Sequence, residues 1–154
     1  MAGGTCAPPA GWSNVTLILA GAMFMQTAAW PPQIELWRPI IEREAAANRI
    51  DPALLAAIIH IESRGWAGAV SRSGACGLMQ VMASDTATVH PELFADRPTC
   101  IELMNPAFNV AWGADYLATN YETYGNWPDA LQHYYGRTVD YRYSGLILAL
   151  CREY

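Results

Sequence analysis

The sequence predicts a single, mainly α-helical domain, and three observations carry that expectation. Strand signals are scarce. A capping residue followed by proline, a typical helix start, occurs twice, at Asp51-Pro52 and Asn105-Pro106. The chain has 154 residues, of which 53% are apolar and 15% are charged. That length suits one domain, and that composition fills a core and argues against disorder.

The first two expected helices lie in the segment before residue 63. One begins at Pro39 and covers 40–48, which is rich in good helix formers. The next follows Asp51-Pro52 and covers 53–62, and Gly65 is expected to close it. Because residues 53–62 are apolar nearly all round, this helix should be central and buried.

A turn-rich loop and further helices complete the expected domain. Residues 63–77 contain four glycines, which predicts a loop after the central helix. Apolar side chains then recur at helical spacing, with glycines as stops. The remaining helices are expected at 106–124, ended by Gly125, at 128–135, ended by Gly136, and at 141–151.

The N-terminal segment is unlike the rest of the chain. No charged side chain precedes Glu35, and residues 15–30 form an apolar run too short for an ordinary membrane span. Small residues at 27–29 suit a cleavage site, although no lysine or arginine precedes the run. We expect residues 1–30 to be a signal peptide or N-terminal anchor, and residues 31–154 to form the domain. The alternative is a buried N-terminal helix.

Charge and metal-ligand patterns exclude two classes of function. The net charge is −5, so binding of nucleic acid by a basic surface is not expected. No cysteine and histidine lie at metal-site spacing, and the three histidines are scattered, so neither a metal nor another cofactor is expected.

Four cysteines allow three pairings. Cys76 lies in a glycine-rich turn and Cys100 in a polar loop, so a disulfide between them could staple two loops in an oxidising compartment. The pairing of Cys6 and Cys151 stays open, because removal of a signal peptide would remove Cys6.

Glu62 is a carboxyl in an unfavourable place. It follows Ile58 by four residues and Leu55 by seven, so it shares a face with them on the most apolar expected helix. It also lies in the last turn, where the helix dipole disfavours a negative charge. Both effects raise a carboxyl pKa, and a protonated Glu can act as a general acid in glycoside cleavage. The alternative is a helix that ends early and leaves Glu62 solvated.

A second candidate segment, Gly77 to Gln80, follows the turn-rich loop. Glycines let a substrate approach the backbone, and Gln80 offers both a donor and an acceptor to sugar groups. With Glu62, this segment predicts one wall of a cleft. The alternative is a core segment with one exposed glutamine.

Three ordered motifs resemble those of the lytic transglycosylases of the soluble, Slt-like type, which share the goose-type lysozyme fold. Glu62-Ser63 is similar to the family's Glu-Ser pair, and residues 71–80 to its Ser-x-x-Gly-Ala-x-Gly-Leu-Met-Gln run. The segment NPAFNVAWGADYL, residues 105–117, is similar to its third motif. The resemblance covers about residues 40–136 and implies a lysozyme-like domain whose turn-rich loop lines a glycan-binding cleft.

The resemblance implies an activity and roles for individual residues. Such enzymes cleave the bond between N-acetylmuramic acid and N-acetylglucosamine in peptidoglycan and leave 1,6-anhydro-muramic acid ends. Glu62 then takes the acid/base role. The other implied sugar contacts or groove residues are Ser71, Gln80, Met79 and Tyr134, with Tyr134 bonding near Glu62. Among the remaining aromatic residues, we expect Tyr116 and Tyr135 to line the groove.

The sequence departs from the family near its end. Residues 133–137 read His-Tyr-Tyr-Gly-Arg where the family has Ala-Tyr-Asn-Ala-Gly, and the last helix lacks the family's Glu-Thr-Arg pattern. These differences predict an altered groove floor and a trimmed domain.

Two rival functions therefore stay open. One is a hydrolytic lysozyme, for which Asp85 or Asp96 would supply a second carboxylate. Asp85, however, is expected in the first turn of a helix capped by Ser84. The other is a non-catalytic protein that binds the wall.

The expected setting is outside the cytoplasm. We expect an exported monomer in the periplasm or extracellular space, with peptidoglycan glycan strands as its partner. Wall remodelling, a secretion or conjugation apparatus and a phage particle are all settings that fit such a protein.

Overall fold

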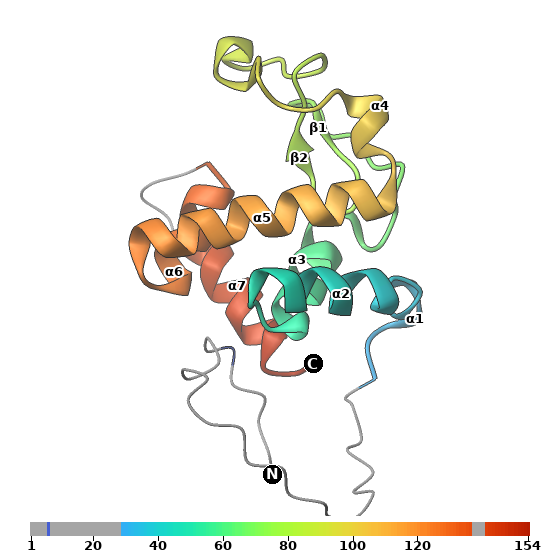
Figure 1. Ribbon diagram of the computed structural model, residues 1–154, viewed down its shortest axis with the longest axis vertical. Helices are drawn as coiled ribbons and strands as arrows, with labels where there is room; N and C mark the ends of the chain where they lie inside the picture. Colours follow the sequence, from blue (N-terminus) through green and yellow to red (C-terminus); the bar gives the residue numbers. More distant parts are fainter. Residues whose placement is uncertain (1–5, 7–28, 137–140) are drawn as a thin grey trace, which may run out of the picture.

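The computed structural model describes Cys6, residues 29–136 and residues 141–154. These residues are mostly helical, which confirms the predicted fold class. Helix α5 (Pro106–Tyr124) crosses the middle of the molecule in Figure 1. The other long helices lie on one side of it, and a loop region with a small β-hairpin rises on the other.

The first helices confirm the prediction that the helix before the turn-rich loop is central and buried. Helices α1 (Pro32–Glu35) and α2 (Arg38–Asn48) lead into α3 (Pro52–Ser63). The Asp51 side chain caps α3 by accepting a hydrogen bond of 2.9 Å from the Ala53 amide. Six consecutive residues of α3, 54–59, have no exposed surface. The chain leaves α3 through two left-handed residues, Arg64 (φ 54°) and Gly65 (φ 80°), so the reversal begins one residue before the predicted glycine.

The loop region contains structure that the sequence pattern did not predict. Strands β1 (Ala75–Cys76) and β2 (Val81–Met82) pair in antiparallel fashion. A 3-10 helix, η1 (Pro91–Phe94), and the short helix α4 (Cys100–Leu103) follow. Each element is too short to show a hydrophobic period.

The last three helices lie close to their predicted bounds. Helix α5 starts after Asn105, whose side chain accepts a hydrogen bond of 3.1 Å from the Phe108 amide. It ends at Gly125, which has φ 72°. Helices α6 (Trp127–Tyr134) and α7 (Arg142–Cys151) follow, and α7 packs on both α6 and α3. The core therefore forms around α3, beneath α5.

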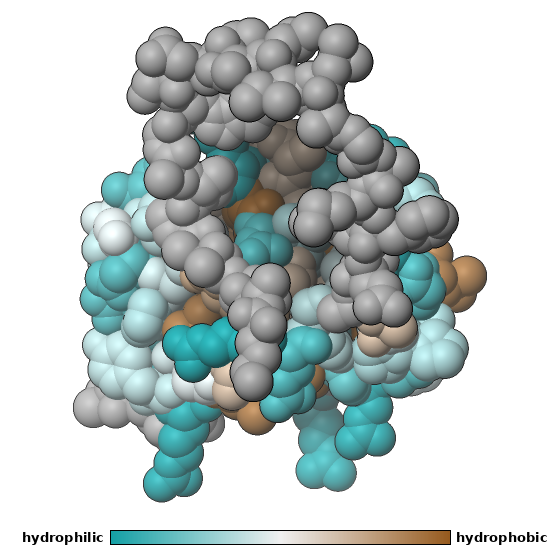
Figure 2. Space-filling view, turned by 90° about the horizontal axis from the view of Figure 1, so that it is seen from below, coloured by the Kyte–Doolittle hydropathy of each residue, from teal (hydrophilic) through white to brown (hydrophobic). Residues whose placement is uncertain are grey.

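The predicted signal peptide or anchor at 1–30 falls mostly outside the described residues. Of that segment, Cys6 forms a disulfide with Cys151 in the last turn of α7, the pairing that the sequence left open. Trp30 is buried. No helix in the described part of the chain is long and apolar enough to cross a bilayer. The end of the molecule seen in Figure 2 mixes hydrophilic and hydrophobic residues wherever it is not drawn in grey.

Candidate active site

Glu62 lies in the last turn of α3, where α7 packs against it. The Tyr143 hydroxyl of α7 donates a hydrogen bond of 2.5 Å to Glu62 Oε1. Burial raises the pKa of the Glu62 carboxyl to about 7, although the bond from Tyr143 acts in the opposite direction. The raised pKa predicted from the sequence is therefore present, and burial is its main cause.

No charged side chain among the described residues adds to the shift of the Glu62 pKa. A paired carboxylate would raise that pKa by repulsion, and a nearby arginine would lower it. The electrostatics are those of an isolated carboxyl in an apolar setting, which holds its proton near neutral pH. Such a group can donate a proton to a leaving oxygen.

Two tyrosines flank Glu62, and the sequence anticipated only one of them. Tyr134 of α6 lies near enough for the charge of Glu62 to raise its pKa, although burial is the larger cause. Its hydroxyl, however, donates a bond of 2.7 Å to the Met79 carbonyl and not to the carboxylate. Tyr143 makes the contact with Glu62. Nothing in the sequence marked Tyr143. The C-terminal segment carries no family motif, and the sequence does not show which face of its helix packs against the helix that carries Glu62.

A buried asparagine of α5 holds the Gly77–Gln80 segment in place. Asn109 Nδ2 donates to the carbonyls of Cys76 and Leu103, both at 2.9 Å, and its Oδ1 accepts from the Met79 amide at 2.8 Å. Asn109 is fully buried. All three of these side-chain bonds tie the loop region to the core, so the third motif positions the second.

The predicted sugar contacts of this segment lie in different environments. The Met79 side chain is fully buried and packs against Gly113, so it supports the segment from beneath and is not on a surface. Gln80 has φ 49°. The nitrogen of its side chain, Nε2, donates to the backbone carbonyls of Ala69 and Gly77 at 3.1 and 3.0 Å. Its side-chain oxygen makes no hydrogen bond with the described residues, which leaves an acceptor for a ligand.

Ser71 and the two predicted groove tyrosines are placed by local contacts. The Ser71 hydroxyl accepts a bond of 3.0 Å from the Ala75 amide, which braces the turn before β1. Tyr135 is 46% exposed and stacks on Tyr143, with ring centroids 4.3 Å apart. Tyr116 lies 5.8 Å from Tyr134, centroid to centroid. Both tyrosines therefore contact a residue that flanks Glu62.

Two surface hollows of the described residues do not have Glu62 in their lining. One is lined by residues around Trp30 and Arg38, and the other by residues around Trp127 and Arg152. The glycan-binding cleft beside Glu62, and the sugar contacts assigned to it, therefore remain predictions.

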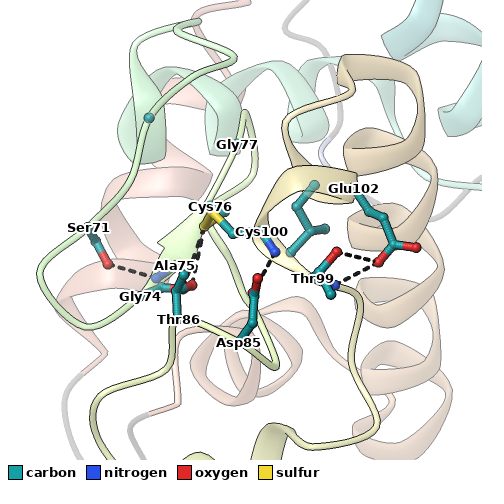
Figure 3. The surroundings of a disulfide bond; sticks show 12 residues. Ser71, Gly74, Ala75, Cys76, Gly77, Asp85, Thr86, Thr99, Cys100 and Glu102 are labelled. Atoms are coloured by element: carbon teal, nitrogen blue, oxygen red, sulfur yellow. Dashed lines mark hydrogen bonds between the residues drawn. A yellow bond between two sulfur atoms is a disulfide. The ribbon is translucent and has the colours of Figure 1, made fainter.

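The predicted Cys76–Cys100 disulfide is present and joins β1 to the start of α4. Figure 3 shows its surroundings. The Asp85 carboxylate accepts a bond of 2.7 Å from the Cys100 amide. The expectation that Ser84 caps a helix containing Asp85 is wrong, because residues 84–86 form a turn and the carboxylate serves the first turn of α4 instead. Asp96 is exposed.

Removal of the loop disulfide is expected to destabilise the domain. The double substitution Cys76→Ser with Cys100→Ser removes a cross-link between residues 24 positions apart. We expect a loss of about 3 kcal/mol in the free energy of unfolding. Urea denaturation under oxidising conditions measures it. The companion variant, Cys6→Ser with Cys151→Ser, keeps only the loop bridge and measures the separate contribution of the other disulfide. Unchanged stability of the first variant would show that the bridge does not constrain the loop.

One group of described residues has metal-ligand proximity. Ligand atoms of Cys6, Asp51 and Cys151 lie within 4.8 Å of one another. Both sulfur atoms are already bonded to each other, so neither offers a thiolate.

Comparison with known proteins gives a consistent picture. The family described as "Transglycosylase SLT domain" matches residues 39–139. The endo-type membrane-bound lytic murein transglycosylases A of Salmonella typhimurium and Salmonella enteritidis are each 40% identical over 114 residues, covering 68% of this chain and 56% of theirs. The chain thus spans about half the length of these curated relatives.

Two solved structures show the same fold at low sequence identity. The 70-kDa soluble lytic transglycosylase, in complex with bulgecin A, aligns with a TM-score of 0.55 and 22% identity over 77% of this chain and 21% of that one. An inactive mutant of the lytic transglycosylase Slt from Pseudomonas aeruginosa aligns with a TM-score of 0.53 and 24% identity over 76% and 20%.

Proposed function

The chain belongs to the transglycosylase SLT domain family, and on that premise we propose that it cleaves peptidoglycan glycan strands with Glu62 as its single acid/base. The observation that carries the proposal is the partly buried Glu62 carboxyl, whose pKa is raised to about 7 with no second charged group of the described residues acting on it. A reaction that runs on one carboxyl needs a group that holds its proton and then takes one back.

The proposed reaction uses Glu62 twice. First, the protonated carboxyl gives its proton to the glycosidic oxygen between N-acetylmuramic acid and N-acetylglucosamine, and that bond breaks. The carboxylate then takes the proton of the muramyl C6 hydroxyl while that oxygen bonds to C1. A 1,6-anhydro ring forms, no water is consumed, and Glu62 returns to its protonated state. The bond from Tyr143 stabilises the carboxylate between the two steps.

The neighbouring residues are proposed to hold the glycan. Gln80 offers its free side-chain oxygen, and Ser71 its hydroxyl, to sugar groups near the scissile bond. Tyr116 and Tyr135 offer ring faces. The contribution of Met79 comes through its backbone, since its carbonyl and amide hold Tyr134 and Asn109.

The hydrolytic rival is less well supported by the placement of its candidate residues. A lysozyme of the inverting type needs a second carboxylate about 6.5–9.5 Å from the acid, with room for water between them. Asp85 is engaged by the Cys100 amide, and Asp96 is exposed. Neither shifts the pKa of Glu62.

We also propose that the protein acts outside the cytoplasm. Two disulfides suit an oxidising compartment. The bond between Cys6 and Cys151 would keep the N-terminal segment attached to the domain even after cleavage near residue 28, which suits a retained segment better than a discarded signal peptide. Residues 31–154 are the proposed catalytic domain.

The pH dependence of cleavage is expected to report on Glu62. The general acid must be protonated, so kcat/KM should fall above about pH 7, where the carboxyl ionises. Tyr143→Phe should move this alkaline limb to higher pH, because the lost hydrogen bond had lowered the pKa of Glu62. Release of soluble fragments across pH 5–9 measures the alkaline limb of the wild-type protein and that of the variant.

A matched variant separates this effect from general damage. Tyr141→Phe also removes a tyrosine hydroxyl near the start of α7, but its partner is Asp129. It should leave the alkaline limb in place. An unmoved limb in Tyr143→Phe would contradict the assignment of that limb to Glu62.

Incubation with purified peptidoglycan tests the proposed function. Soluble muropeptides should accumulate with the wild-type protein and not with Glu62→Gln. Binding to the wall without any released fragment would instead support the non-catalytic rival.

A further inference from the structure

Arg97 is held above a cluster of aromatic rings. Its guanidinium carbon lies 4.8 Å from the ring centroid of Phe94, 5.2 Å from that of Trp112 and 4.7 Å from that of Tyr116. Phe94 comes from η1, and the two other rings come from α5. Rings that contact a guanidinium through its face leave its in-plane N–H groups free to bond.

The guanidinium has no carboxylate partner within 4.0 Å and no side-chain hydrogen bond among the described residues. The side chain is half-buried, in a protein with 14 acidic and 9 basic residues. A held, partly desolvated guanidinium with free donors binds an anion well, and bidentate pairing with a carboxylate is its best match.

Arg97 is connected to the Glu62 site through two tyrosines. It contacts Tyr116, which lies 5.8 Å from Tyr134, centroid to centroid. Tyr134 in turn bonds the Met79 carbonyl of the Gly77–Gln80 segment. The charges of Arg97 and Glu62 both act on the Tyr134 hydroxyl. Arg97 and Glu62 therefore both lie near Tyr134, which makes Arg97 a neighbour of the proposed glycan site.

We infer that Arg97 binds a carboxylate of the peptide carried by the glycan strand, and so makes the protein select peptide-bearing strands. This inference rests on the proposed function. In such strands the lactyl carboxyl of muramic acid is tied up in the amide bond to the peptide. The free carboxylates are therefore those of the peptide itself. Arg97 is a specificity residue and takes no part in proton transfer.

Three substrates separate the sources of the carboxylate. The first is native peptide-bearing strands. The second is the same strands with their carboxylates converted to primary amides by carbodiimide and ammonia. The third is strands stripped of peptide by an amidase, which exposes the lactyl carboxylate. KM and kcat are measured on each for wild type, Arg97→Gln and Arg97→Lys.

The expected result is that Arg97→Gln differs from wild type in KM on native strands only. Arg97→Gln should raise that KM about tenfold, as for loss of a charge-assisted pair, and leave kcat unchanged. Amidated strands should give wild type the same higher KM. Arg97→Lys should recover part of the loss, since it keeps the charge but not the bidentate geometry. Arg43→Gln, which alters an exposed arginine of α2, should match wild type on every substrate.

Two results would overturn the inference. An equal KM change on native and amidated strands would show that Arg97 only braces the aromatic cluster. Dependence on Arg97 that persists on stripped strands would assign it to the lactyl carboxylate instead.

A binding measurement keeps this inference separate from the proposed function. Calorimetric titration of the wild-type protein with a soluble muramyl peptide, native or amidated, needs no turnover. Preference for the native ligand that disappears in Arg97→Gln supports the carboxylate site even if no strand is cleaved. Equal affinity for the two ligands rejects the site even if cleavage is confirmed.

Discussion

Replacement of Glu62 by glutamine is expected to lower the rate of glycan cleavage by about 10³-fold or more while the fold stays intact. Glutamine has the shape of the protonated carboxyl, and its oxygen can still accept the bond from Tyr143. It has no acidic proton to give to the leaving oxygen. Turnover by the purified variant, with its circular dichroism spectrum as the check on folding, measures the effect. Substantial residual cleavage would contradict the assignment.

The same substitution is expected to change how stability depends on pH. The pKa of Glu62 is raised in the folded protein from its ordinary 4.5 to about 7, so the folded state binds the proton more tightly. The stabilisation from protonated Glu62 is full below about pH 4.5 and is lost as the pH rises through 7. Glu62→Gln removes this loss and should be more stable than wild type at pH 8, by on the order of 2–3 kcal/mol.

Urea denaturation at pH 4.5 and pH 8 tests this expectation. The matched control is Glu122→Gln, because Glu122 is an exposed carboxyl on α5. Its pH dependence should follow that of wild type. Identical pH dependence in Glu62→Gln and wild type would show that burial does not perturb Glu62.

Gly77→Ala is expected to be strongly destabilising and to disturb the segment next to the site. Gly77 has φ 79°, and an added Cβ would lie 2.2 Å from Asn109 Nδ2 and 2.3 Å from the Leu103 carbonyl oxygen. Asn109 is fixed by its three buried bonds and cannot yield without breaking them. We expect a loss of about 3 kcal/mol or more in the free energy of unfolding, and a matching loss of cleavage.

Gly125→Ala separates the clash from the backbone strain. Gly125 has a similar φ of 72°, but an added Cβ there meets nothing within 4 Å. Its cost should be only the left-handed strain, about 1 kcal/mol, with cleavage unchanged. Thermal or urea unfolding of both variants gives the comparison. Equal costs would mean that Asn109 does not hold the Gly77–Gln80 segment rigidly.

The features that the sequence predicted correctly are those set by neighbouring residues. The starts of α3 and α5 follow from Asp51-Pro52 and Asn105-Pro106, since a cap and a proline act within one turn. The burial of Glu62 follows from its spacing on an apolar helix. Its raised pKa depends mainly on that burial, so it too was within reach of sequence reasoning.

The features that the sequence did not predict depend on contacts between distant segments. The bond from Tyr143 to Glu62 spans 81 positions, and it requires the register of α7 against α3, which no local pattern encodes. The bond from Cys100 to Asp85 was missed for a related reason. A cap that serves a helix 15 residues away looks, in the sequence, like a cap for its own segment. The position of Met79 shows the same limit, because its buried side chain faces Gly113 of a later helix.

The ring structure at the ends of the released sugars tests the central claim most directly. Wild-type protein is incubated with purified peptidoglycan, and the soluble products are analysed by mass spectrometry. If Glu62 acts alone, every new muramic acid end should be a 1,6-anhydro form, lighter by one water molecule than the hydrolysed form. Reducing muramic acid ends would contradict the single-carboxyl account, because they require an activated water and a second group to activate it.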